Sequence, residues 1–161
     1  MDTVLSLYDP DNSLIDQHDD RSRFNKNYSS TWRNMNIGYF ADGPWAHQAL
    51  QKMFSDASLQ VGFICARHDR PDQVLKEMAR EKQIPFLTHS RINSSEFRNQ
   101  LNKYQCDLFV SMSFNQIFRR EIFEMPPLRT INCHAGKLPF YRGRNILNWV
   151  LINDEAEFGI T

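Results

Sequence analysis

Asn132 and His134 are the residues of this chain best suited to chemistry, because they stand two apart at the end of an apolar run. In an extended segment, residues i and i+2 point to the same side, so the two side chains should project together while Cys133 turns to the opposite face. An imidazole exchanges a proton near neutral pH, and an amide offers both a hydrogen-bond donor and an acceptor. The spacing therefore predicts one polar centre beyond a strand end, although a histidine taken alone is more often structural.

An irregular connection follows this pair of residues. It contains the Leu138-Pro139 unit, an aromatic pair at residues 140–141 and Gly143, all of which are residue types that interrupt regular structure. Residues 144–153 then have the sequence of a helix. The pattern predicts a loop of fixed shape between the polar centre and a final helix.

The elements that must position this centre alternate between strand and helix. Five short apolar runs are the predicted strands, at residues 36–40, 59–65, 85–88, 107–111 and 129–134. Helical stretches lie between them, at residues 45–54, at residues 72–83 and from residue 94 to about residue 104. This alternation predicts an α/β fold, in which a mainly parallel, Rossmann-like sheet is flanked by helices. Such a sheet binds its ligands beyond the carboxyl ends of its strands, so three loops should share one cleft.

Gly43 and Pro44 mark the start of the first helix, since glycine suits the cap and proline suits the first helical position. The free N–H groups of a helix amino terminus favour a phosphate, so Gly43, Pro44 and the following Trp45 are candidate substrate-binding residues. Ordinary capping explains the glycine and the proline equally well, and Asp42 would repel a phosphate. A second helix cap is predicted at Asp69.

The carboxy-terminal segment resembles the signature of the formyltransferases that use 10-formyltetrahydrofolate. The positions that match its Asn-x-His, Leu-Pro, Tyr-Arg-Gly and Gly-Val-Thr units are Asn132, His134, Leu138-Pro139, Tyr141, Arg142-Gly143 and Gly159-Ile160-Thr161. The similarity runs from about Met35 to the last residue. It implies that Asn132 and His134 are catalytic and that residues 35–161 are the amino-terminal part of a Rossmann-like formyltransferase core, incomplete at its carboxy terminus.

The resemblance also implies the ligands of the cleft, with 10-formyltetrahydrofolate as the formyl donor. The residues expected to line the folate pocket are Met112, Ser113, Phe114 and Ile117. Those expected to contact the acceptor, besides the residues at the first helix, are Tyr141, Arg142 and Arg144. Core packing is the alternative for Phe114 and Ile117, and Arg142 could equally brace the turn by binding carbonyl groups.

Three stretches resemble one branch of that family. Ala135-Gly136-Lys137 and Asn145-Ile146 depart from the Pro-Ser-Leu and Ala-Pro that are common in methionyl-tRNA formyltransferases, and they look like the sugar N-formyltransferases, as do residues 36–47. The expected acceptor is therefore the amine of a nucleotide-linked amino sugar, for example a dTDP-amino-dideoxy sugar used in cell-surface polysaccharide (O-antigen) biosynthesis. A methionyl-tRNA formyltransferase-like enzyme is an alternative. The resemblance also allows a homodimer of the complete protein.

In the resembling family, Asn132 would donate an N–H to the oxyanion that forms when the amine attacks the formyl carbon, and His134 would take the amine proton. The family's third catalytic residue, an aspartate, would lie beyond Thr161. The expectation is a front part of an enzyme that is inactive or very weak by itself. Two other interpretations are a noncatalytic remnant that at most binds nucleotide sugar or folate, and a dinucleotide-dependent oxidoreductase, for which the G-x-G-x-x-G fingerprint is missing.

Composition argues against several other functions. The 161 residues have a formal net charge of zero and no long basic run, so neither nucleic acid nor a membrane is expected as a partner. No apolar run reaches membrane-spanning length and no signal peptide is recognisable, which predicts a cytoplasmic protein. Cys65, Cys106 and Cys133 lie in apolar runs and are predicted to be buried, reduced thiols. No metal site is expected from the spacing of the remaining histidines, which are His18, His47, His68 and His89.

Residues 1–34 differ in character from the rest of the chain. They are rich in aspartate, serine and asparagine, and their apolar residues have no sustained period. This composition predicts a disordered or loosely attached leader, to which no function is assigned.

Overall fold

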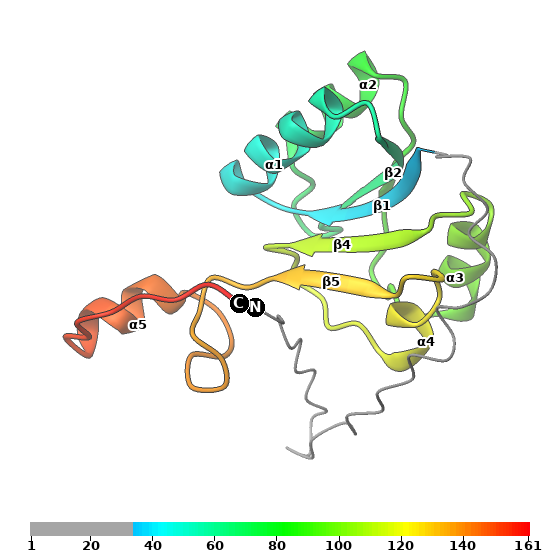
Figure 1. Cartoon of the computed structure of the whole chain (residues 1–161). Coiled ribbons are helices and arrows are strands. Elements are labelled where there is room, and N and C mark those ends of the chain that lie inside the picture. The colour runs from blue at the N-terminus through cyan, green and yellow to red at the C-terminus, as the bar shows by residue number, and fades with distance from the viewer. Residues whose placement is uncertain (1–33) are drawn as a thin grey trace. The chain divides into compact units, whose positions relative to one another are not determined.

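Five parallel strands in the order β3-β2-β1-β4-β5 form the centre of the structure (Figure 1). The computed structural model describes residues 34–161, so the predicted leader lies outside the described residues, apart from Asn34. The strands are β1 (Met35–Ala41), β2 (Leu59–Ala66), β3 (Phe86–Thr88), β4 (Leu108–Met112) and β5 (Thr130–Cys133). The helices are α1 (Pro44–Ser55), α2 (Gln73–Glu81), α3 (Ser95–Asn102), α4 (Arg120–Phe123) and α5 (Ile146–Ile152). The predicted α/β fold with a parallel sheet is confirmed.

Two apolar cores lie on the two faces of the sheet, because neighbouring residues of a strand point to opposite sides. On one face, Tyr39 packs in a cluster with Leu50 of α1 and Leu75 of α2. On the other face, Phe40 packs in a cluster with Phe97 of α3. Figure 1 shows the same division, with α1 and α2 on one side of the strands and α3 and α4 on the other. Because all five strands are parallel, their carboxyl ends lie along the same edge of the sheet.

Capping residues determine where the helices begin. As predicted, α1 begins directly after Gly43, which has a φ of 82° and is followed by proline at the first helical position. Helix α2 is capped by Asp72, whose carboxylate accepts a hydrogen bond from the N–H of Leu75 at 3.0 Å. The predicted cap at Asp69 is therefore wrong. Its carboxylate instead pairs with Arg67, because the chain runs three residues farther before the helix starts.

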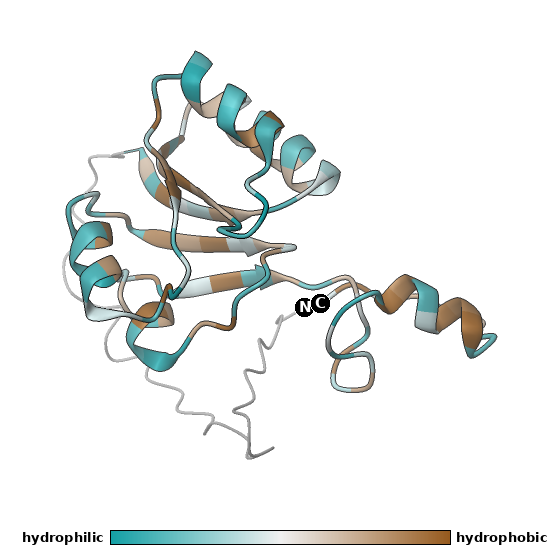
Figure 2. Ribbon diagram, turned by 180° about the vertical axis from the view of Figure 1, so that it is seen from behind, coloured by the Kyte–Doolittle hydropathy of each residue, from teal (hydrophilic) through white to brown (hydrophobic). Residues whose placement is uncertain are grey.

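Two helices differ from the sequence-based expectation. Helix α4 is a single turn, which is too short for an apolar period to be recognised. Helix α5 begins at Ile146 rather than at residue 144, because Asn145 has the left-handed conformation with a φ of 55°. Figure 2 shows that α5 is largely apolar, yet only Ile146 and Val150 of this helix are buried, and Trp149 is 54% exposed. Among the described residues no helix, α5 included, is long and apolar enough to cross a membrane.

Gly38 lies where two aromatic rings close over β1. A Cβ atom at this position would lie 2.5 Å from ring atoms of Phe63 and 2.6 Å from the ring of Phe109. We expect Gly38→Ala to lower the free energy of unfolding by about 1–3 kcal/mol, because packed rings must shift to admit a methyl group. Urea unfolding measures this change, with Gln51→Ala on the exposed side of α1 as the control. Equal midpoints for Gly38→Ala and the unmodified protein would contradict this account of the packing.

Candidate active site

A cavity of about 600 Å³ opens at the carboxyl edge of the sheet. Its walls come from the connections that follow β1, β2, β4 and β5 and from the first turn of α5. The lining residues are Trp45, Arg67, Ser113, Phe114, Asn115, Asn132, Cys133, His134, Ala135, Gly143, Arg144, Asn145, Ile146, Leu147 and Asn148. The cavity lies at the strand ends where ligands bind in doubly wound sheets, and its size is that of a small-molecule site.

Half of the predicted site residues line this cavity, namely Asn132, His134, Ser113, Phe114, Trp45 and Arg144. The other half, which are Gly43, Pro44, Met112, Ile117, Tyr141 and Arg142, do not line it. The side chain of Met112 packs against the core cluster beneath α1 and α2. Ile117 is 81% exposed, and its carbonyl accepts a hydrogen bond from Asn93 at 2.8 Å. The structure thus brings the predicted catalytic pair together with part of each predicted binding set.

Main-chain hydrogen bonds hold His134 at the end of β5. Its N–H donates to the carbonyl of Thr161 at 2.7 Å, and its carbonyl accepts from the N–H of Thr161 at 2.9 Å. The hydroxyl of Thr161 donates to the carbonyl of Gly136 at 2.9 Å and accepts from the N–H of Leu138 at 3.3 Å. On the ring, Nε2 of His134 lies 2.7 Å from the carbonyl oxygen of Tyr141. The histidine is therefore fixed both through its backbone and through its imidazole.

The loop after His134 is braced by its own side chains. Nε of Arg142 donates to the carbonyl of Pro139 at 2.9 Å, so this arginine does brace the turn. The hydroxyl of Tyr141 donates to Glu155 at 2.5 Å and accepts from Nδ2 of Asn153 at 3.2 Å. These contacts explain why neither side chain lines the cavity.

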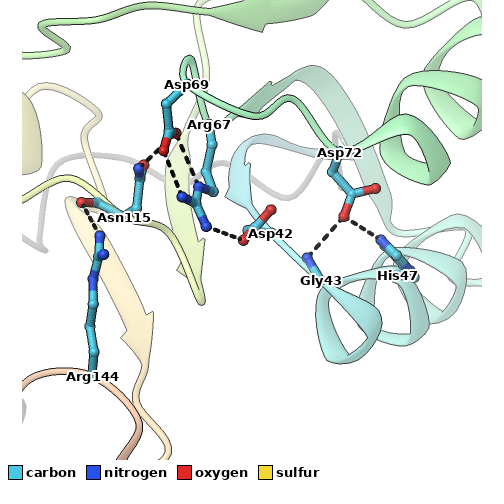
Figure 3. Close-up of polar contacts among 8 residues, drawn as sticks. All are labelled: Asp42, Gly43, His47, Arg67, Asp69, Asp72, Asn115 and Arg144. Carbon is cyan, nitrogen blue, oxygen red and sulfur yellow. Dashed lines mark hydrogen bonds and ion pairs between the residues drawn. The ribbon is translucent and has the colours of Figure 1, made fainter.

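Polar contacts join the four connections that follow β1, β2, β4 and β5 (Figure 3). The guanidinium of Arg67 lies between two carboxylates, with nitrogen to oxygen distances of 2.7 Å to Asp69 and 3.3 Å to Asp42. Nδ2 of Asn115 donates to Asp69 at 3.1 Å, and Nη2 of Arg144 donates to the carbonyl of Asn115 at 3.1 Å. Hydrogen bonds from Arg67 lower the pKa of Asp69 to about 2. The carboxylate of Asp69 is therefore charged throughout the physiological pH range.

Arg67 and Asn115 are cavity residues that sequence reasoning did not select. Arg67 directly follows β2, so its position at the carboxyl edge of the sheet is a signal that could have identified it. Oδ1 of Asn115 is buried and has no hydrogen-bond partner among the described residues. It is an acceptor that a ligand N–H could satisfy.

A second network surrounds Asp72 and occupies the amino terminus of α1 (Figure 3). One oxygen of its carboxylate accepts from the N–H of Gly43 at 3.0 Å and contacts Nε2 of His47 at 2.8 Å. Burial alone would raise the pKa of Asp72, but the hydrogen bonds from Leu75, His47 and Gly43 together lower it. The N–H of Gly43 is thus bound to a carboxylate, which removes one of the donors that made Gly43 and Pro44 candidates for phosphate binding.

Cys133 corrects one expectation, that all three cysteines are buried. It is exposed, whereas Cys65 and Cys106 are buried as predicted, and all three cysteines are free thiols. The reason is that β5 is an edge strand in this structure and ends at Cys133. Cys133 also borders the cavity, as do Asn132 and His134. Within residues 34–161 no cluster of three or more potential ligand side chains could hold a metal ion.

Comparison with known proteins identifies the family. A family model described as formyl transferase matches residues 43–161, which include the whole candidate site. The chain belongs to the formyl transferase family. The chain is 33% identical over 135 residues to a methionyl-tRNA formyltransferase of Desulforamulus reducens, an alignment that covers 79% of the chain and 42% of that protein. It is 40% identical over 87 residues to the methionyl-tRNA formyltransferase of Geobacter metallireducens, which covers 54% of the chain and 28% of that protein.

Solved structures share the fold of this chain. Glycinamide ribonucleotide transformylase 1 from Geobacillus kaustophilus superposes with a TM-score of 0.67 at 19% identity, covering 80% of this chain and 73% of that chain. A formyltetrahydrofolate deformylase from Pseudomonas syringae superposes with a TM-score of 0.64 at 15% identity, covering 80% and 45%. At these identities the likeness establishes the fold alone. The chain spans about two fifths of the length of the Desulforamulus relative.

The family uses 10-formyltetrahydrofolate as formyl donor, and the cavity of this chain has features that suit such a group. Its volume of about 600 Å³ is ample for a flat heterocycle. Phe114 offers an aromatic surface at the wall, although the ring also packs against the core. The unpartnered oxygen of Asn115 provides an acceptor for a ring N–H. Ser113, Phe114 and Asn115 are therefore the residues best placed to hold the donor.

Replacing Asp72 tests the network at the start of α1. We expect Asp72→Asn to lower the free energy of unfolding at pH 7 by about 1–2 kcal/mol, because the charge-assisted bonds to Gly43 and His47 are weakened. The lowered pKa of Asp72 stabilises the fold fully above its unfolded value of about 3.9, and this stabilisation is lost as the pH falls through the folded value. Urea unfolding at pH 5 and pH 3 should therefore show a smaller loss of stability in Asp72→Asn than in the unmodified protein.

The control is Glu81→Gln, which changes an exposed carboxylate at the end of α2. It should retain the pH dependence of the unmodified protein. An equal loss of stability between pH 5 and pH 3 in Asp72→Asn and in the control would exclude Asp72 as the source of acid sensitivity.

Proposed function

We propose that this chain carries the catalytic centre of an enzyme that moves a formyl group from 10-formyltetrahydrofolate to a primary amine. The observation that carries the proposal is the convergence of Asn132 and His134 on one cavity, within the segment that the family model matches. Family membership supports the choice of donor. The unpartnered acceptor on Asn115 supports its place in the cavity.

The two residues divide the chemistry between charge stabilisation and proton transfer. The donor, when bound, supplies an electrophilic formyl carbon. Asn132 donates a side-chain N–H to the formyl oxygen, on which negative charge grows as the amine attacks. His134 accepts the proton that the attacking nitrogen must lose and returns a proton to the departing nitrogen. The main-chain pair with Thr161 keeps the imidazole at the cavity throughout.

Two acceptors are candidates, and different observations favour them. The names of the curated relatives favour methionyl-tRNA. The nucleotide-linked amino sugar is favoured by the stretch at residues 135–137. A Cβ atom at Gly136 would lie 2.4 Å from the carbonyl oxygen of Tyr141, so the serine common at this position in methionyl-tRNA formyltransferases would not fit here. The zero net charge of the chain also favours the sugar, since nucleic-acid binding relies on basic surface.

Substitution of the catalytic pair tests the reaction. In the complete protein, we expect His134→Ala to lower kcat by about 10²–10⁴-fold, as for loss of a general base. Asn132→Ala should lower kcat by about 10²–10³-fold, as for loss of an oxyanion donor. Release of tetrahydrofolate is followed spectrophotometrically with an amine acceptor, and Glu81→Gln is the matched control. Full activity in both variants would rule out this centre.

A competition between acceptors tests the substrate class. The complete protein is given 10-formyltetrahydrofolate with methionyl-tRNA and, separately, with a panel of nucleotide-linked amino sugars, and formylated product is detected by mass spectrometry. If Gly136 marks an enzyme that acts on amino sugars, the sugar panel should yield product and methionyl-tRNA should not. Product from methionyl-tRNA alone would establish the acceptor named by the relatives and reject the amino sugar.

A further inference from the structure

The hydrogen bond on the ring of His134 determines which nitrogen carries its proton. Nε2 lies 2.7 Å from the main-chain carbonyl oxygen of Tyr141. A carbonyl oxygen can only accept, so Nε2 must be the donor. In the neutral imidazole one nitrogen is a donor and the other an acceptor. Nδ1 is therefore the nitrogen that holds the free electron pair.

This contact exists because residue 136 has no side chain. A Cβ atom on Gly136 would lie 2.4 Å from the carbonyl oxygen of Tyr141 and 2.7 Å from Nε2 of His134, directly at the hydrogen bond between them. Real Cβ atoms do not approach other atoms this closely, and one of the two contacts is main chain, which cannot rotate away. Gly136 itself is buried and held in place, since its N–H donates to the carbonyl of His134 and its carbonyl accepts from Thr161.

We propose that Gly136 is a positioning residue that lets the Tyr141 carbonyl lock His134 in the Nε2–H tautomer, so that Nδ1 is the atom that accepts the proton of the attacking amine. The inference rests on the proposed function, because it assigns the proton transfer to one atom of the same site. The acceptor nitrogen bonds to the formyl carbon and loses one proton to Nδ1. The bond between the formyl carbon and the donor nitrogen breaks, and that nitrogen receives the proton back from Nδ1. Nε2–H remains bonded to the carbonyl of Tyr141 in both charge states of the ring.

The tautomer can be measured without any assay of activity. In protein labelled with ¹⁵N in the histidine rings, long-range ¹H–¹⁵N correlation spectra at a pH where His134 is neutral distinguish a protonated Nε2 from a protonated Nδ1. We expect protonated Nε2 in the unmodified protein. Gly136→Ala should give a mixture or the other tautomer, and in the complete protein it should lower kcat about 10- to 100-fold with little change in KM.

Two variants of the same loop are controls for the spectrum. Phe140→Ala removes a side chain that is 80% exposed, and Tyr141→Phe removes the hydroxyl while it keeps the carbonyl. Both should keep the tautomer of the unmodified protein. Protonated Nδ1 in the unmodified protein would overturn the inference, and this result does not depend on whether Gly136→Ala folds. An unchanged tautomer in folded Gly136→Ala would also overturn it.

The tautomer and the proposed function can fail separately. Protonated Nε2 in a complete protein that forms no formylated product with any acceptor would refute the proposed function and leave the ring assignment in place. Formyl transfer by a protein with protonated Nδ1 would refute only the assignment of the base.

Discussion

The candidate active site depends on the main-chain pair between His134 and Thr161, because this pair closes the long connection that leaves β5. The pair consists of two hydrogen bonds, at 2.7 and 2.9 Å, and the Thr161 hydroxyl adds a third contact to the loop. Closing a long loop costs conformational entropy once, after which contacts within it form locally. The turn bracing by Arg142 and the ring contact of His134 both lie inside this closed segment. The hydrogen bonds between His134 and Thr161 thus help to set the position of the reactive histidine.

The cavity wall is held by a different kind of interaction, in which opposite charges lie side by side. Arg67 is paired with Asp69 and Asp42, so its positive charge is satisfied within the wall. Asn115 then carries the contact across to Arg144 through its side chain and its carbonyl. None of these groups belongs to the two apolar cores, which are complete without them. Different interactions therefore stabilise the two features: apolar packing stabilises the fold, and polar contacts hold the wall of the cavity.

The fold could be predicted because the signals for it are local. The alternation that sends Tyr39 and Phe40 to opposite cores is a period of two, and the start of α1 is signalled by neighbouring residues. The pair formed by Asn132 and His134 was predictable for the same reason, since their spacing alone directs both to one edge. The contact between Asp69 and Asn115 was not predictable, because it spans 46 positions and depends on strand order. The exposure of Cys133 likewise follows from its place on an edge strand, which no local pattern reveals.

The carboxylate of Asp72 contacts two helices at once. It caps α2 through Leu75, and it also holds Gly43 and His47 at the beginning of α1. The two helices are therefore joined to each other at their amino termini by one side chain. Trp45, in the first turn of α1, lines the cavity. A single carboxylate thus links both helices to the part of the cavity wall that Trp45 forms.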